Sequence, residues 1–165
     1  MDKRSVIDFV LVSFIIILGI FIGFNIFKGD DVKFINRNDL YDLATKYIEE
    51  NDLNVYRNKD NYKLFISYDG FGIAEDDKYR YAYMWIIKDS YYIQNGEIKN
   101  AGGSSIPYKF IFSKDDKVIK YYNPEDGRGY DASLMKLFPR SIYNKIKKYK
   151  VDNSKIDLEV KNYYK

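Results

Sequence analysis

The first chemical pattern in the sequence is Ser133-Leu134-Met135-Lys136, the S-x-x-K spacing with which some serine acyl enzymes activate their nucleophile. In that arrangement the lysine lies one helical turn from the serine and helps to remove its proton. The companion S-D-N and K-T-G motifs are absent, and serine and lysine are frequent enough here for such a pair to arise by chance. We therefore expect no acyl-enzyme chemistry at Ser133.

Carboxylates, the other common catalytic groups, occur mainly as neighbouring pairs. Adjacent residues on a strand point to opposite faces, so such doublets are typical of solvated turns. Asp69 with Asp89, across two strands, stays open as a hydrolase-like acidic pair. The chain contains no His and no Cys, which excludes the usual Cys/His zinc sites, disulfides and His-based triads. The sequence thus predicts no catalytic residue, no metal site and no cofactor.

Aromatic and basic side chains form the candidate binding surfaces. Tyr81, Tyr83 and Trp85 share one side of an expected strand, a pattern typical of a core and also of a face that stacks on sugar rings. The basic run that includes Lys147 and Lys148 is typical of a solvated helix face and also of a surface that meets anionic lipid or polymer. A cell-wall polymer site built from these five residues therefore remains an alternative to a plain core with a solvated helix.

Two glycine-containing loops are further candidates for binding. One spans residues 102–107 and the other residues 124–130, and ordinary turn geometry explains their glycines equally well. No GKS or GKT follows either loop, so neither is a phosphate loop. The candidate binding residues in these loops are Ser104, Ser105, Arg128 and Tyr130.

Residues 9–27 read FVLVSFIIILGIFIGFNIF and contain no charged side chain. As a helix this run is about 28 Å long, close to the ~30 Å hydrocarbon thickness of a bilayer. A cleaved signal peptide has a shorter apolar run, followed by small residues at the cleavage site. We expect an uncleaved single-pass transmembrane helix, with the lipid bilayer as its partner.

The overall charge excludes nucleic acid as the main partner. The 165 residues contain 27 Lys+Arg and 24 Asp+Glu, a net charge of +3, whereas nucleic-acid-binding domains usually carry a dense basic stripe. Basic residues on the two sides of the apolar run nearly balance, so the positive-inside rule leaves the orientation of the span open.

Hydropathy patterns beyond the span predict one α+β domain. The period is helical up to residue 51 and alternating from residue 62 onward. Asn95-Gly96 is the strongest hairpin signal, because both residues tolerate a positive φ. The expected elements are a helix over Asp39–Asn51, strands over Tyr62–Tyr68, Tyr79–Ile93, Ile106–Phe112 and Lys117–Tyr122, short helices ending near Phe138 and spanning Arg140–Tyr149, and an edge strand over residues 156–161.

A helix followed by an antiparallel meander is typical of α+β folds in which the helix crosses a four- to five-stranded sheet. Cystatin-like and NTF2-like folds have this arrangement. The expected organisation is a cytoplasmic tail over residues 1–8, a transmembrane helix over 9–27, a linker over 28–36 and an α+β domain over 37–165.

A family resemblance covers the stretch from Tyr83 to Ile146. It depends on the hairpin at Asn95-Gly96, the run GSSIP from residue 103, and PEDGRGYDASLMKLFP from residue 124. These motifs resemble an extracytoplasmic C-terminal region attached to membrane metallopeptidases of the BlaR/MecR type in Gram-positive anaerobes. The chain has one span and no H-E-x-x-H site, so the resemblance implies the accessory domain alone and transfers no catalytic residue.

Together these observations predict a single-pass membrane protein that presents its α+β domain outside the cytoplasmic membrane of a bacterium. The predicted role is a non-enzymatic protein-interaction or sensory module. Cell-wall polymer binding and acidic-pair hydrolysis are the two alternatives.

Overall fold

The computed structural model describes residues 32–56 and 62–165. The expected tail, transmembrane helix and first part of the linker lie outside these residues. No helix in the described ranges combines the length and the hydrophobicity needed to cross a bilayer. Val32–Lys165 forms one compact unit, and its α+β class agrees with the prediction.

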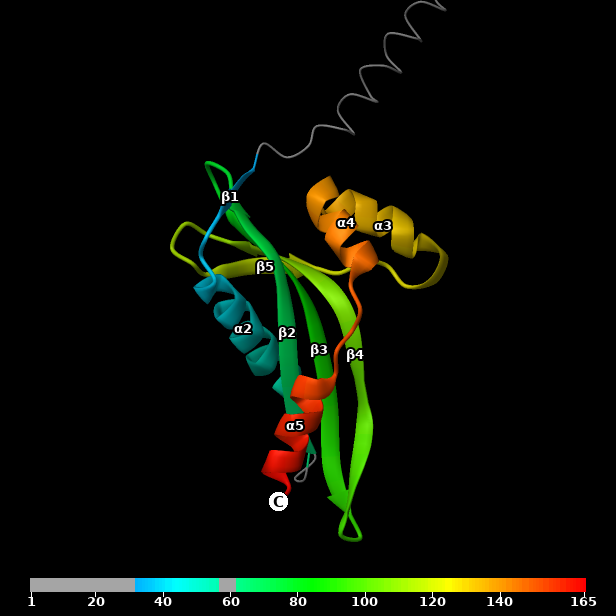
Figure 1. Cartoon of the computed structure of the whole chain (residues 1–165). Helices are drawn as coiled ribbons and strands as arrows, with labels where there is room; N and C mark the ends of the chain where they lie inside the picture. Colours follow the sequence, from blue (N-terminus) through cyan, green and yellow to red (C-terminus); the bar gives the residue numbers. More distant parts are fainter. Residues whose placement is uncertain (1–31, 57–61) are drawn as a thin grey trace, which may run out of the picture. The chain divides into compact units, whose positions relative to one another are not determined.

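A five-stranded antiparallel sheet forms the centre of this unit, with its strands in chain order (Figure 1). Short turns connect successive long strands, so each strand pairs with the one that follows it. The first strand was not predicted: residues assigned to the linker pair with the far end of β2, Lys33 opposite Glu75 and Ile35 opposite Ile73. The strands are β1 (Lys33–Ile35), β2 (Tyr62–Glu75), β3 (Arg80–Gln94), β4 (Glu97–Phe112) and β5 (Val118–Tyr122).

Helices cover both faces of the sheet (Figure 1). One face packs against α2, and the other packs against α3 and α4 at one end and against α5 toward the other end. The helices are α2 (Asp39–Tyr56), α3 (Tyr130–Leu137), α4 (Arg140–Lys148) and α5 (Ser154–Tyr163), with a 3-10 turn, η1 (Gly127–Gly129), before α3.

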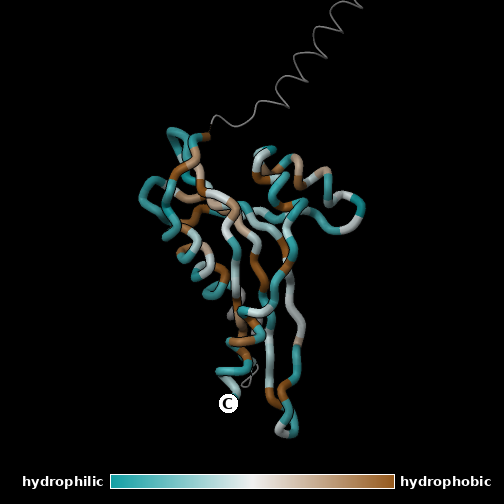
Figure 2. Tube along the Cα trace, in the orientation of Figure 1, coloured by the Kyte–Doolittle hydropathy of each residue, from teal (hydrophilic) through white to brown (hydrophobic). Residues whose placement is uncertain are grey.

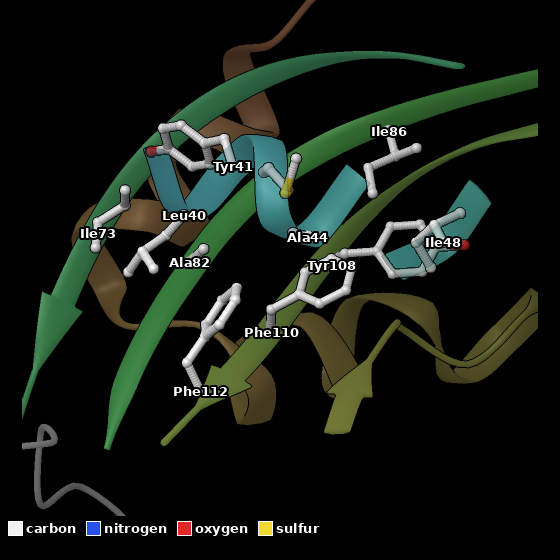
Figure 3. Close-up of a cluster of buried hydrophobic side chains, with 11 residues drawn as sticks. Leu40, Tyr41, Ala44, Ile48, Ile73, Ala82, Ile86, Tyr108, Phe110 and Phe112 are labelled. Atoms are coloured by element: carbon white, nitrogen blue, oxygen red, sulfur yellow. The ribbon is translucent and has the colours of Figure 1, made fainter. Parts of the chain in front are cut away.

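The larger core lies under α2 (Figure 3). Leu40, Ala44 and Ile48 recur every four residues and are all buried, which turns one stripe of the helix toward the sheet. They pack against alternate residues of β3, such as Met84 and Ile86, and against the aromatic residues of β4. Each fully buried Leu, Ile, Met or Phe side chain stabilises the fold by roughly 1.5–3 kcal/mol relative to exposure.

The second face carries two smaller clusters. In one, Tyr83 packs against Leu134 of α3 and Ile142 of α4. In the other, Phe65 and Ile87 pack against the C-terminal helix. As far as the described residues go, all three clusters lie within the compact unit Val32–Lys165.

A β-bulge in β2 explains why the alternation of apolar and polar residues stops before the strand itself ends. Gly70 lies opposite Met84 and Gly72 lies opposite Tyr83, so Phe71 is the extra residue. The bulge exchanges the two faces: even-numbered residues face α2 before it, and Ile73 faces α2 after it. The strand therefore continues to Glu75, beyond the predicted end at Tyr68.

The β3–β4 turn has the predicted geometry. Asn95 has φ 55° and Gly96 has φ 80°, the positive values that a type I′ turn requires. The next irregularity is a bulge at Ala101, where the register shifts between Asn100 and Gly102. Figure 2 shows hydrophobic residues close to the β3–β4 turn. Ile93 and Ile98 are paired there, and each is about half exposed.

The C-terminal segment corrects the sequence prediction, because residues 156–161 belong to α5 and not to an edge strand. Ile156 and Val160 are buried one helical turn apart, whereas Leu158 is 60% exposed. Alternation of apolar residues at 156, 158 and 160 fitted a strand, but an i, i+4 pair fits a helix equally well. Ser154 at the start of the helix donates its backbone N–H to Asp152 Oδ1 at 2.9 Å.

Candidate interaction surface

The outer side of β4 is a sheet edge over most of its length. β4 pairs with β3 along its whole course, but β5 covers only Lys109–Phe112. Among the described residues, no strand lies beside Glu97–Tyr108 on that side. An unpaired edge presents backbone N–H and C=O groups that can accept another strand. We call the segment Gly103–Ile106 the β4 edge.

Proline indicates which backbone groups of this edge face outward. Pro107 has no N–H, and within a sheet such a residue is placed where its nitrogen points away from the neighbouring strand. Because orientation alternates along a strand, Gly103 and Ser105 turn both their N–H and their C=O groups to the same outer side. The β4 edge therefore offers two donors and two acceptors, bounded by the bulge at Ala101 and by the end of β5.

Two of the predicted binding residues come together at the β4 edge. The indole Nε1 of Trp85 donates to Ser105 Oγ at 2.8 Å, and the half-buried Trp85 ring also packs against Tyr149, with 5.0 Å between ring centroids. Ser104 points to the other face, toward α2, since it lies opposite Lys88. Its Oγ is buried and has no hydrogen-bond partner within the described part of the chain.

The aromatic row is mostly core. Tyr83 is completely buried and packs against Phe138, so its ring offers no platform for a sugar. Tyr81 is half-buried, donates its hydroxyl to Asp76 Oδ2 at 2.5 Å, and has the Lys109 ammonium 5.1 Å from its ring centroid. As a polymer-binding residue Tyr83 is therefore excluded, because α3 and α4 cover it.

The remaining predicted binding residues lie around α3 and α4. Arg128 is exposed on η1, while Tyr130 is partly buried against the cluster beneath these helices. Lys147 pairs with Asp131 at 2.9 Å, and this hydrogen bond raises the pKa of Lys147. Lys148 is exposed. None of these four residues lies at the β4 edge.

Neither catalytic alternative finds a suitable arrangement of side chains. Asp69 lies opposite Trp85 and Asp89 lies opposite Phe65, which separates the two acids by four strand positions, roughly 13 Å. Glycosidase carboxylates lie about 5–9.5 Å apart. Ser133 Oγ donates to the Tyr130 carbonyl at 2.8 Å and accepts the Glu125 N–H, so its hydroxyl has a structural role.

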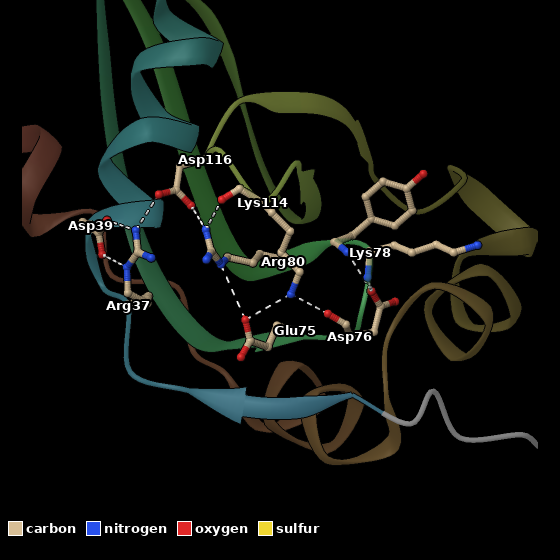
Figure 4. Close-up of polar contacts among 9 residues, drawn as sticks. Arg37, Asp39, Glu75, Asp76, Lys78, Arg80, Lys114 and Asp116 are labelled. Carbon is tan, nitrogen blue, oxygen red and sulfur yellow. Dashed lines mark hydrogen bonds and ion pairs between the residues drawn. The ribbon is translucent and has the colours of Figure 1, made fainter.

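The charged residues at the other end of the sheet form a connected network (Figure 4). Asp116 bridges Arg37, at 2.8 Å, and Arg80. The hydrogen bond from Arg37 is the main cause of the lowered pKa of Asp116, and Arg37 lowers the pKa of Asp39 in the same way. Lys114 lowers the pKa of Glu75. These carboxylates are ionised and each is bound to a basic side chain. Their ion pairs connect the start of α2 with the β2–β3 and β4–β5 turns, and a carboxylate held in this way is unsuited to proton transfer. The described residues contain no cluster of acids that suits a metal ion.

The opposite sheet edge, on β2, is partly occupied by side chains. Lys155 donates to the Tyr68 carbonyl at 3.3 Å and Lys145 donates to the Phe71 carbonyl at 2.6 Å. Farther along, Leu64–Ile66 form the floor of an open groove of about 530 Å³ between α2 and α5, with Glu49 and Glu159 on its walls. The β2 edge is therefore occupied at Tyr68 and Phe71 and open along Leu64–Ile66.

Comparison with known proteins adds no identification: no protein-family model, no curated protein and no solved structure matches the chain.

Only part of the candidate surface was visible in the sequence. The sequence points to Ser104 and Ser105 through a glycine-containing loop and to Trp85 through an aromatic row, and neither pattern indicates a sheet edge. The free edge itself depends on β5 being shorter than β4, and the Lys117–Tyr122 pattern, followed by Pro124, was the one available signal of that difference.

Proposed function

We propose that this chain is a single-pass, membrane-anchored module outside a bacterial cytoplasmic membrane that binds an extended segment of a partner protein at the β4 edge. The observation that carries the proposal is the unpaired edge beside Trp85 and Ser105. Strand addition of this kind takes its affinity from main-chain hydrogen bonds and its specificity from side chains flanking the edge. The proposal assigns no chemical reaction to the chain.

Anchoring and location depend on the sequence alone. The uncharged run over residues 9–27 supports a membrane span. The resemblance to an accessory domain of BlaR/MecR-type peptidases supports a place outside the membrane of a Gram-positive bacterium. A helix lying across an antiparallel meander also fits a cystatin-like or NTF2-like arrangement, which we keep as part of the proposal.

Ser105 offers a matched pair of variants for the test. Ser105→Pro and Ser105→Ala both remove the bond from Trp85, but only proline removes the outward N–H. Since that N–H faces away from β3, proline there breaks no hydrogen bond within the sheet. A photo-reactive phenylalanine analogue at the exposed bulge residue Ala101 then reports what lies beside the edge in intact cells.

We expect a specific protein adduct that persists in Ser105→Ala and falls to background in Ser105→Pro, with both variants equally folded by circular dichroism. Equal adduct yields in the two variants would refute strand addition. Retention of glycan alone would favour the polymer-binding alternative. Protease treatment of intact protoplasts tests the location separately, because a protected segment 32–165 places the domain inside.

A further inference from the structure

Positive charge is concentrated in one part of the chain. Residues 130–150, which contain α3 and α4, include six basic side chains and one acid, a net charge of +5. The whole chain has +3, so all other residues together carry −2. Such a block marks an anionic partner more clearly than the overall charge does.

The fold turns part of this charge outward on α4. Ile142 and Ile146 are buried, which fixes the opposite side of the helix in solvent. Arg140, Asn144 and Lys148 follow one another every four residues along that side, and all three are exposed.

Most of these cations have no anionic partner among the residues that the structure describes. Lys147 pairs with Asp131, the one acid of the segment, and Lys145 is bound to the Phe71 carbonyl. Within the described residues, none of the other four basic side chains makes an ion pair. These four are Lys136, Arg140, Lys148 and Lys150.

The start of the described domain lies against the buried side of α4. Val32 packs against the cluster that contains Ile142 and Ile146 of α4. Phe27, the last residue of the uncharged run, precedes Val32 by five residues, which span at most about 18 Å when fully extended. If residues 9–27 cross a membrane, α4 is within reach of its headgroups.

We propose that the exposed side of α4, through Arg140, Lys148 and Lys150, docks on the anionic headgroups of the membrane that holds residues 9–27. This inference rests on the membrane anchoring proposed above. Basic residues close to an anionic membrane surface each favour binding by about fivefold. Figure 1 shows α4 and the β3–β4 turn at opposite ends of the domain, so docking directs that turn away from the membrane.

The test uses the full chain in nanodiscs. Because the sequence contains no Cys, a nitroxide can be attached at one chosen position. Asn144→Cys places it in the middle of the proposed contact, and Gln94→Cys places it beside the β3–β4 turn as a control. Accessibility to a water-soluble nickel chelate is compared in discs of phosphatidylcholine and in discs rich in phosphatidylglycerol.

We expect anionic lipid to shield the label at position 144 and to leave the label at position 94 unchanged. The double substitution Arg140→Gln/Lys148→Gln should weaken docking roughly 25-fold, about fivefold for each charge removed, and high salt should act in the same direction. Equal exposure in the two lipids, or shielding that survives the double substitution, overturns docking. A chain that fails to enter nanodiscs at all contradicts the anchoring itself.

Discussion

The contact between Gly70 and Tyr41 gives the sharpest prediction about how α2 is held on the sheet. A Cβ at position 70 would lie 2.4 Å from Tyr41 Cε2 and 2.5 Å from Cζ, about 1 Å closer than carbon atoms normally approach. Tyr41 is 8% exposed and packs within the larger core, so its ring has little room to move away. Overpacking of this kind typically costs about 1–3 kcal/mol. We expect Gly70→Ala to lower the free energy of unfolding by that amount.

Urea unfolding of residues 32–165, followed by the fluorescence of Trp85, measures this cost. Trp85 is the single tryptophan of the chain. For a domain of this size the predicted loss corresponds to a melting temperature roughly 4–11 °C lower. Gly129→Ala is the matched control, because its Cβ would approach closely only the flexible carboxylate of Glu125 and the φ of −81° at this position suits alanine.

A double-mutant cycle separates the steric cause from a general effect of alanine. In a Tyr41→Leu background the ring is gone, so Gly70→Ala should be neutral or stabilising by about 0.4–1 kcal/mol through the unfolded state. The same destabilisation in both backgrounds would refute the argument, and so would an unchanged stability of Gly70→Ala alone.

Two predictions concern pH. The pKa values of Asp116, Asp39 and Glu75 are lowered, so these carboxylates stabilise the fold above their ordinary pKa of about 4 and lose that contribution as the pH falls through the lowered values. Urea unfolding below pH 5 should show this loss of stability, and Asp116→Asn should make the free energy of unfolding less dependent on pH. Burial and the bond to Asp69 raise the pKa of Tyr149 to about 12, so its stabilising contribution should persist up to pH 10 and disappear between pH 10 and 12. Ultraviolet titration should then lose one late-ionising phenol in Tyr149→Phe, and an unchanged late phase would contradict this assignment.

Much of the fold was predictable because its signals are local. The Asn95-Gly96 turn needs only two residues that tolerate positive φ, and the stripe on α2 needs only apolar residues spaced by one helical turn. The long β3 strand was equally clear. Its alternation identified Tyr83 as one of a row. It did not show whether a helix covers that row, because the covering residues Leu134, Phe138 and Ile142 are distant in the sequence.

The errors have a common origin in patterns that fit two structures. Ile156 and Val160 are four residues apart, which places them on the same face of a strand and also on the same side of a helix. In the folded domain they form a helix whose buried side packs against Phe65. The bulge at Phe71 reverses the alternation in β2, so the pattern ended before the strand did.

By itself the sequence determined the α+β class, the long hairpin, the apolar run and the absence of Cys/His chemistry, since each follows from residue type and local spacing. Tertiary structure alone decided that Tyr83 is core and that Asp69 and Asp89 stay apart. It also decided that no described strand lies beside the β4 edge, while lysines bind the Tyr68 and Phe71 carbonyls at the β2 edge. The physical reason is that burial and strand pairing depend on which distant segments meet, and short-range periodicity contains no record of that.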